Sequence, residues 1–184
     1  GLKCLNPHGS SFTPPQQEEL EGRVGKAPRK GWECQGDLAE ADLVAGHREA
    51  ILARREVARG LGVVLDCGNG AGAVVTPDLL SRMGVAVLPL NCHTGGFFAR
   101  PSEPAEAGLG YVAQMVRAGS ADCGVVHDGD ADRMMAFDGK GRLIDGDRLL
   151  VLFARYLDAE KVVTTMDASM IIDEIAEVQR TPVG

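Results

Sequence analysis

The chain has 184 residues, of which 45% are hydrophobic, 24% are charged and only 4% are aromatic. Its formal net charge of −7 argues against nucleic-acid binding, which needs clustered Lys and Arg against the phosphates. No stretch is apolar enough for a membrane helix, and the five cysteines contain no C-x-x-C pair, so we expect a cytoplasmic protein without disulfides or zinc.

The first third of the chain predicts two helices joined by a linker. Thr13 is suited to cap a helix, with Pro14 at its first position and Gln16 three residues after the cap, and this short helix should run to Leu20. Residues 22–36 are typical of a linker, and a longer helix capped by Asp37 should end near residue 60. Because the chain begins with Gly and not with Met, we expect it to be a fragment of a longer protein.

From residue 61 onward, short apolar runs alternate with turn signals and amphipathic segments, as in a largely parallel sheet. The predicted strands are residues 63–65, 85–90 and 123–127. The predicted helices are residues 77–83, with Thr76 as the cap, and 109–119. A Gly-rich turn lies between the first strand and the first of these helices, at residues 68–72.

The segment Asp138-Gly139-Lys140-Gly141 between two apolar runs is a strong hairpin signal and adds an antiparallel ribbon to the sheet. After it we expect a helix capped by Asp147, a strand at residues 162–165 and a helix at residues 168–177. The predicted fold class is therefore α/β, a three-layer α/β/α arrangement around a mixed, mostly parallel sheet, flanked by parts of neighbouring domains.

Asp128, Asp130 and Asp132 alternate with small residues directly after the apolar strand at residues 123–127. Side chains that leave a strand end together can converge on one hard cation, and carboxylate oxygens are the ligands that Mg²⁺ prefers. Without a cation, three like charges this close would destabilise the fold. A solvated acidic turn is the alternative, whereas an EF-hand is excluded because its sixth and twelfth positions hold Arg133 and Gly139.

Two further patterns could indicate a functional site: a Gly-rich segment that resembles a dinucleotide-binding turn, and a histidine next to the aspartates. Residues 68–73 formally satisfy G-x-G-x-x-[GA] after a strand, but no acidic residue follows about twenty positions later to bind a ribose. We therefore interpret this segment as a tight turn that lets its helix pack close to the sheet. His127 adjoins the aspartates, and its simplest interpretation is a strand-end residue whose hydrogen bonds are satisfied.

Three segments taken together resemble a known family. They are residues 64–72, with the sequence VLDCGNGAG, the loop Arg100-Pro101-Ser102-Glu103-Pro104, and residues 128–133. Their order and spacing resemble the second domain of the α-D-phosphohexomutases, which include phosphomannomutase/phosphoglucomutase and phosphoglucosamine mutase. The resemblance implies that Asp128, Asp130 and Asp132 hold Mg²⁺, that Lys3 acts in proton transfer and that Arg133 contacts the phosphoryl group.

By the same resemblance, the parent enzyme interconverts hexose 1-phosphate and 6-phosphate through an enzyme phosphoserine and a bisphosphorylated sugar. Residues 1–36 would be the end of the catalytic-serine domain, 37–160 the metal-binding second domain, and 161–184 the start of the third. Without the serine loop, the fragment should be inactive alone. Three alternatives stay open: a phosphoglucosamine mutase of the same family, an aspartate-nucleophile phosphatase of the haloacid dehalogenase class, and a non-enzymatic metal-stabilised binding module.

Overall fold

A computed structural model describes residues 4–34, 36–54, 57 and 60–182 of the chain. The chain divides into two compact units, residues 1–41 and residues 42–184. Lys3 lies outside the described residues. Within them, no helix is both long and apolar enough to cross a membrane.

The described residues of the first unit form one α-helix and one short 3₁₀ helix. The helix α1 (Pro14–Arg23) begins where the sequence predicts and continues for three residues beyond Leu20. The backbone N–H of Thr13 donates to the Gln16 side-chain oxygen at 2.9 Å, so the glutamine closes the first turn as expected. The predicted linker contains the 3₁₀ helix η1 (Trp32–Cys34).

The second unit opens with helix α2 (Val44–Leu52), which is shorter than the helix predicted from Asp37. The prediction chose the wrong acidic residue as the start. The Asp42 carboxylate accepts hydrogen bonds from the backbone N–H groups of Val44 and Ala45 at 3.0 and 3.4 Å. Since a capping carboxylate satisfies the free N–H groups of the first turn, the helix begins after Asp42.

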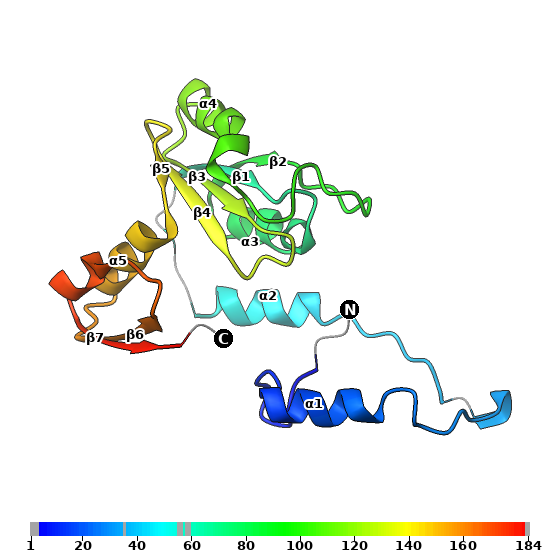
Figure 1. The fold of residues 1–184 in the computed structure, drawn as a ribbon. Helices are drawn as coiled ribbons and strands as arrows, with labels where there is room; N and C mark the ends of the chain where they lie inside the picture. Colours follow the sequence, from blue (N-terminus) through cyan, green and yellow to red (C-terminus); the bar gives the residue numbers. More distant parts are fainter. Residues whose placement is uncertain (1–3, 35, 55–56, 58–59, 183–184) are drawn as a thin grey trace. The chain divides into compact units, whose positions relative to one another are not determined.

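A five-stranded mixed sheet forms the body of this unit (Figure 1). Its strands are β1 (Gly62–Asp66), β2 (Ala86–Leu90), β3 (Cys123–His127), β4 (Met134–Asp138) and β5 (Leu143–Ile144). They lie in the order β2-β1-β3-β4-β5. The pairs β1–β2 and β1–β3 are parallel, and β3–β4 and β4–β5 are antiparallel, which confirms the mixed sheet and the predicted hairpin.

Helices lie on both sides of this sheet, with α4 (Gly110–Ala118) on one side and α3 (Thr76–Arg82) on the other (Figure 1). Thr76 is the first residue of α3 and not its cap. The apolar face of α4 packs on alternate strand residues, as expected for an amphipathic helix on a pleated surface. The buried cluster consists of Val64, Leu109, Val112, Ala113, Val116, Val126 and Phe137.

The remainder of the second unit corrects two predictions. Helix α5 (Gly146–Tyr156) is capped by Asp145, whose carboxylate accepts from the Arg148 N–H at 2.9 Å, and not by Asp147. The helix predicted at residues 168–177 is absent: the structure has the 3₁₀ helix η4 (Met170–Glu174) and then a strand, β7 (Glu177–Thr181). That strand pairs in parallel with β6 (Lys161–Thr165), and the pairing overrides the local helical preference.

Candidate metal centre

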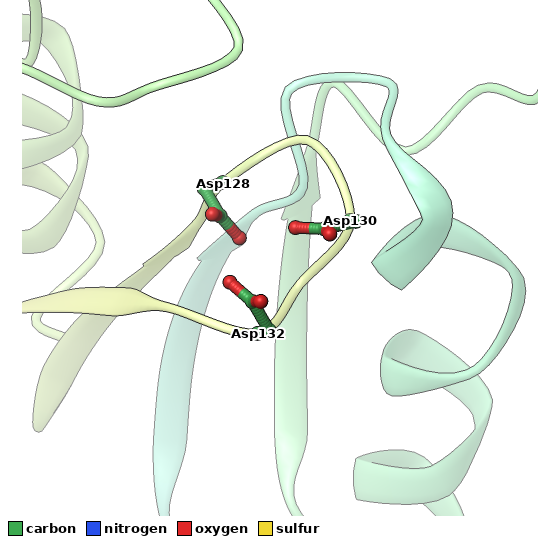
Figure 2. Close-up of side chains that lie close together, drawn as sticks. All are labelled: Asp128, Asp130 and Asp132. Atoms are coloured by element: carbon green, nitrogen blue, oxygen red, sulfur yellow. The ribbon is translucent and has the colours of Figure 1, made fainter. Parts of the chain in front are cut away.

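The loop between β3 and β4 brings three carboxylates together. Asp128, Asp130 and Asp132 each offer one oxygen atom, and these atoms all lie within 4.8 Å of one another (Figure 2). Asp128 is buried, with 2% of its surface exposed, whereas the other two are exposed. The three carboxylates therefore converge just after the end of β3, with two of them exposed to solvent, and their role as metal ligands stays a prediction.

The donor set and the spacing suit a hard divalent cation. Mg²⁺ takes oxygen ligands at about 2.0–2.1 Å. The three carboxylate oxygens, which lie within 4.8 Å of one another, would have to move closer together to hold one such ion, and rotation of the two exposed aspartate side chains can supply that movement. A divalent ion would neutralise most of their combined negative charge and so reduce the repulsion expected for the loop alone.

Arg133 closes the loop against its buried aspartate. The Asp128 carboxylate accepts from the Arg133 backbone N–H at 3.2 Å and from the Arg133 Nε at 2.9 Å, and the same Nε lies 3.6 Å from an Asp132 oxygen. Burial tends to raise the pKa of Asp128, but the hydrogen bonds and charge of Arg133 outweigh it, and the pKa lies below the usual carboxyl value. Asp128 is therefore ionised at neutral pH, as a metal ligand must be.

Glu103 is a member of the site that residue patterns did not single out. Its carboxylate forms an ion pair with the Arg133 guanidinium, which reaches back from the loop after β3 to the loop at residues 91–105. A cavity of about 310 Å³ lies beside this pair and is lined by both residues together with Pro104, Met134, Met135 and Gly146. In the sequence, the one feature that pointed to Glu103 was its position in the loop Arg100–Pro104, which resembles a loop of the α-D-phosphohexomutases.

The Gly-rich turn packs against the aspartate loop. The Ala71 N–H donates to the Gly129 carbonyl at 2.9 Å. A Cβ atom placed on Gly70 would lie only 2.5 Å from that same carbonyl oxygen, so no side chain fits at this position. The sequence predicts a tight turn here, and the structure adds that its closest neighbour is the backbone that carries the aspartates.

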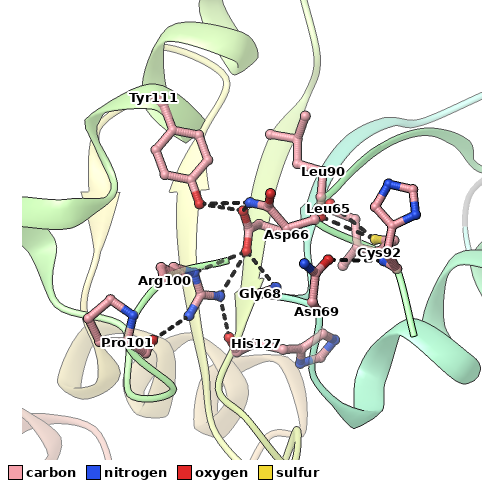
Figure 3. A network of polar contacts seen from close by, with 12 residues as sticks. Leu65, Asp66, Gly68, Asn69, Leu90, Cys92, Arg100, Pro101, Tyr111 and His127 are labelled. Carbon is pink, nitrogen blue, oxygen red and sulfur yellow. Dashed lines mark hydrogen bonds and ion pairs between the residues drawn. The ribbon is translucent and has the colours of Figure 1, made fainter. Parts of the chain in front are cut away.

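Behind the loop lies a polar group of one buried and three partly buried residues, which we name the Asp66 network (Figure 3). It consists of Asp66, Asn91, Arg100 and Tyr111. The Asp66 carboxylate, at the end of β1, is fully buried. One of its oxygens accepts from the Gly68 N–H at 2.8 Å and from the Arg100 Nε and Nη2 atoms at 3.1 and 2.8 Å. The other accepts from the Asn91 amide at 2.5 Å and from the Tyr111 hydroxyl.

The structure contradicts the interpretation of His127. Both of its ring nitrogens are buried, and neither has a hydrogen-bond partner among the described residues. The ring instead packs on the Gly-rich turn, where a Cβ on Gly72 would lie 3.2 Å from the His127 Cδ2. Burial lowers the pKa of His127, so the ring is neutral where it lies.

Comparisons with known proteins place this chain in a family. A family model described as phosphoglucomutase/phosphomannomutase, alpha/beta/alpha domain II, matches residues 44–141. This chain belongs to the α-D-phosphohexomutase family. It is 43% identical over 190 residues to a probable phosphoglucosamine mutase of Methanocella arvoryzae, an alignment that covers 100% of this chain and 43% of the relative. It is 38% identical over 201 residues to the phosphoglucosamine mutase of Methanococcus maripaludis, with 100% and 45% covered.

The fold of this phosphohexomutase chain also matches a solved structure. A phosphoglucomutase/phosphomannomutase family protein from Burkholderia thailandensis superposes with a TM-score of 0.77 at 23% identity, over 96% of this chain and 40% of that chain. The α/β/α fold class predicted from the sequence is confirmed. This chain spans less than half the length of the curated relatives named above. Membership of this family sets aside the haloacid dehalogenase-like phosphatase, which belongs to another class of protein.

Proposed function

We propose that this chain is the metal-binding portion of a Mg²⁺-dependent phosphohexomutase, in which Asp128, Asp130 and Asp132 hold the ion. The observation that carries the proposal is the convergence of three carboxylate oxygens within 4.8 Å in a domain of this family. When bound, Mg²⁺ supplies positive charge to the oxygens of a phosphoryl group in transfer. The three aspartates would determine where that positive charge lies, next to the carboxyl end of β3.

In this proposal Arg133 contacts the transferred phosphoryl group. Its guanidinium is largely exposed, with 62% of the side chain accessible, and it borders the cavity beside Glu103. The ion pair with Glu103 and the hydrogen bond to Asp128 hold the guanidinium at the rim of the loop, so it needs little reorganisation to meet an anion. Planar N–H donors held in this way suit phosphoryl oxygens.

The sugar is proposed from the relatives. Both curated relatives named above are described as phosphoglucosamine mutases. We therefore favour glucosamine phosphate over glucose or mannose phosphate, which narrows the hexose phosphate expected from the sequence. Transfer through an enzyme phosphoserine and a bisphosphorylated sugar belongs to the same proposal and rests on the family resemblance.

Three further parts of the proposal rest on the resemblance alone. Lys3 would act in proton transfer, although it lies outside the described residues. The division into residues 1–36, 37–160 and 161–184 would reflect three successive domains of the parent protein. A cytoplasmic location follows from the proposed metabolic role.

The metal site is tested by measuring Mg²⁺ binding to the chain by isothermal titration calorimetry. Asp130→Asn and Asp132→Asn each remove one charged ligand from an exposed position, so each should weaken binding by about tenfold or more without unfolding the domain. Asp158→Asn is the matched control, because it removes the same charge from an exposed residue outside the loop. Equal Mg²⁺ affinity in all three variants and the wild type would overturn the proposed site.

A second assay addresses the substrate. In the full-length parent protein, the proposal expects interconversion of glucosamine 6-phosphate and glucosamine 1-phosphate to have a higher kcat/KM than the same reaction of mannose phosphate. A preference for mannose or glucose phosphate would leave the metal site in place and reject the proposed sugar.

A further inference from the structure

The Asp66 network has no part in the proposed chemistry, yet it lies directly behind the aspartate loop. Asp66 is one of two carboxylates that are buried among the described residues, and the other is Asp128 itself. Its partner Arg100 is also nearly inaccessible, with 9% of the side chain exposed. A buried charge pair is costly to desolvate, and hydrogen bonds to both partners are needed to offset that cost. The groups that make these hydrogen bonds are therefore held in place by the pair.

Arg100 reaches two elements at once. Through Nε and Nη2 it donates to the Asp66 carboxylate at the end of β1. The same Nη2 donates to the backbone carbonyl of His127 at 2.5 Å. His127 is the last residue of β3 and directly precedes Asp128, so the guanidinium fixes the point at which the aspartate loop leaves the sheet (Figure 3).

This position requires the planar shape of the guanidinium as well as its positive charge. It lies against Gly68, where a Cβ would be only 3.0 Å from the Arg100 Cζ, and its third nitrogen, Nη1, donates to the Pro101 carbonyl at 3.3 Å. A lysine side chain ends one bond short of the Nη2 atom. Lysine at this position would keep a positive charge near Asp66 but would not reach the His127 carbonyl with the same geometry.

We propose that Arg100 is a positioning residue for the metal site: it ties the backbone before Asp128 to the buried Asp66 carboxylate and so fixes the direction of the Asp128 ligand. The inference rests on the proposed function, because it assumes that the aspartate loop binds a divalent ion. Residues that orient metal ligands without touching the ion commonly change metal affinity about 10- to 100-fold when they are replaced.

The test measures binding of Mn²⁺, as a paramagnetic substitute for Mg²⁺, to the whole chain by electron paramagnetic resonance. Arg100→Lys and Arg100→Met should each raise the Mn²⁺ dissociation constant about tenfold or more. The bound-ion spectrum of Arg100→Lys should also differ from that of the wild type, because the Asp128 ligand is displaced. A role in fold stability alone would not alter that spectrum.

Arg180→Met is the matched control. Arg180 also makes a two-pronged ion pair with an aspartate, Asp173, at 2.8 and 2.7 Å, but on β7 and η4 and not at the aspartate loop. The Arg180→Met variant should keep the wild-type affinity for Mn²⁺ and the wild-type spectrum of the bound ion. Circular dichroism of each variant reports whether the domain is folded.

The outcomes separate this inference from the function on which it rests. If the wild type binds Mn²⁺, Asp130→Asn does not, and folded Arg100→Lys binds it with wild-type affinity and spectrum, Arg100 has no positioning role. If Arg100→Lys fails to fold, the ion pair is structural and the inference is also overturned. If the wild type fails to bind Mn²⁺, or Asp130→Asn binds it as tightly as the wild type, the proposed function itself fails.

Discussion

Asp128 and Asp66 are both buried carboxylates at strand ends, but their hydrogen bonds commit them to different tasks. Asp66 accepts five hydrogen bonds within the domain, which satisfy both of its oxygens. Within the part of the chain that the structure describes, Asp128 accepts hydrogen bonds from Arg133, and its open side faces two exposed aspartates. Asp128 therefore keeps lone pairs for a ligand, whereas Asp66 serves as an internal anchor.

The buried Asp66 carboxylate should have a measurable effect on the pKa of Tyr111. Burial and the hydrogen bond to Asp66 raise the pKa of the Tyr111 hydroxyl to about 12, from an ordinary value of about 10. A raised pKa means that the neutral phenol stabilises the folded state below pH 10, and that this contribution is lost as the pH rises from about 10 to about 12.

Absorbance at 295 nm during an alkaline titration checks this expectation. The chain has two tyrosines, so Tyr156→Phe leaves Tyr111 as the single phenol that reports. Its midpoint should fall near pH 12 in the folded chain and near pH 10 in urea. A folded-state midpoint near pH 10 would contradict the hydrogen bond to the buried carboxylate.

At the residue scale, the sequence was informative where the participants are close together in the chain. Asp128, Asp130 and Asp132 follow one strand within five residues, so their convergence could be predicted from spacing. The Asp66 network could not, because Tyr111 and Asp66 are 45 residues apart and Arg100 and Asp66 are 34 apart. Their contact depends on which strand ends are neighbours in the sheet, and spacing along the chain does not report that.

The two loops at the ends of β1 and β3 are packed backbone against backbone. Gly70→Ala should therefore push the loops apart, because its Cβ would lie 2.5 Å from the Gly129 oxygen. We expect a loss of about 1–3 kcal/mol of unfolding free energy, as for other overpacked positions. Urea denaturation measures the loss, and weaker Mg²⁺ binding should accompany it.

Gly46→Ala is the control for this change. Gly46 lies inside α2, and among the described residues no atom outside the adjoining backbone of its own helix lies within 4 Å of the position that its Cβ would occupy. Alanine there should stabilise the chain by roughly 0.5–1 kcal/mol, because glycine is unfavourable in a helix interior. If Gly70→Ala were as stable as wild type, the close approach of the two loops would be wrong.

At the scale of elements, strands with strong local signals were predicted and those defined by their partners were not. The hairpin at residues 134–144 was found because its turn residues specify it. The strand β7 was missed, since EVQRT has no run of buried apolar residues and becomes a strand by pairing with β6. The start of α2 was misplaced because Asp37 and Asp42 are equally good capping residues by type.

At the scale of the whole chain, helix α5 presents an unusual surface. Among the described residues, Leu152, Phe153 and Tyr156 of this helix and Leu157 directly after it are exposed by 51% to 82%. A cavity of about 470 Å³ adjoins it, lined in part by Leu143, Ile144, Val151, Leu152 and Ile171. Contiguous apolar surface of this kind favours association.

We expect the chain to self-associate and to bind the hydrophobic dye ANS at this surface. The double change Leu152→Ser with Phe153→Ser should reduce dye fluorescence at least about twofold, because burial of each side chain is worth about 1.5–3 kcal/mol. Sedimentation velocity should show a smaller associated fraction in the same variant. Leu20→Ser in the first unit, where the residue is 39% exposed, is the control. An unchanged associated fraction in the double variant would assign the contact to another surface.

The contacts that Arg100 makes also have a thermodynamic consequence. They join the ends of β1 and β3 to a loop 34 residues from one and 27 from the other, so an unfolded chain has no preformed place for the ion. A ligand that binds only the native state stabilises it in proportion to the logarithm of its concentration, by about 2.7 kcal/mol at one hundred times its dissociation constant. If the aspartate loop binds Mg²⁺ as proposed, the surrounding free magnesium concentration helps to set how much of this protein is folded.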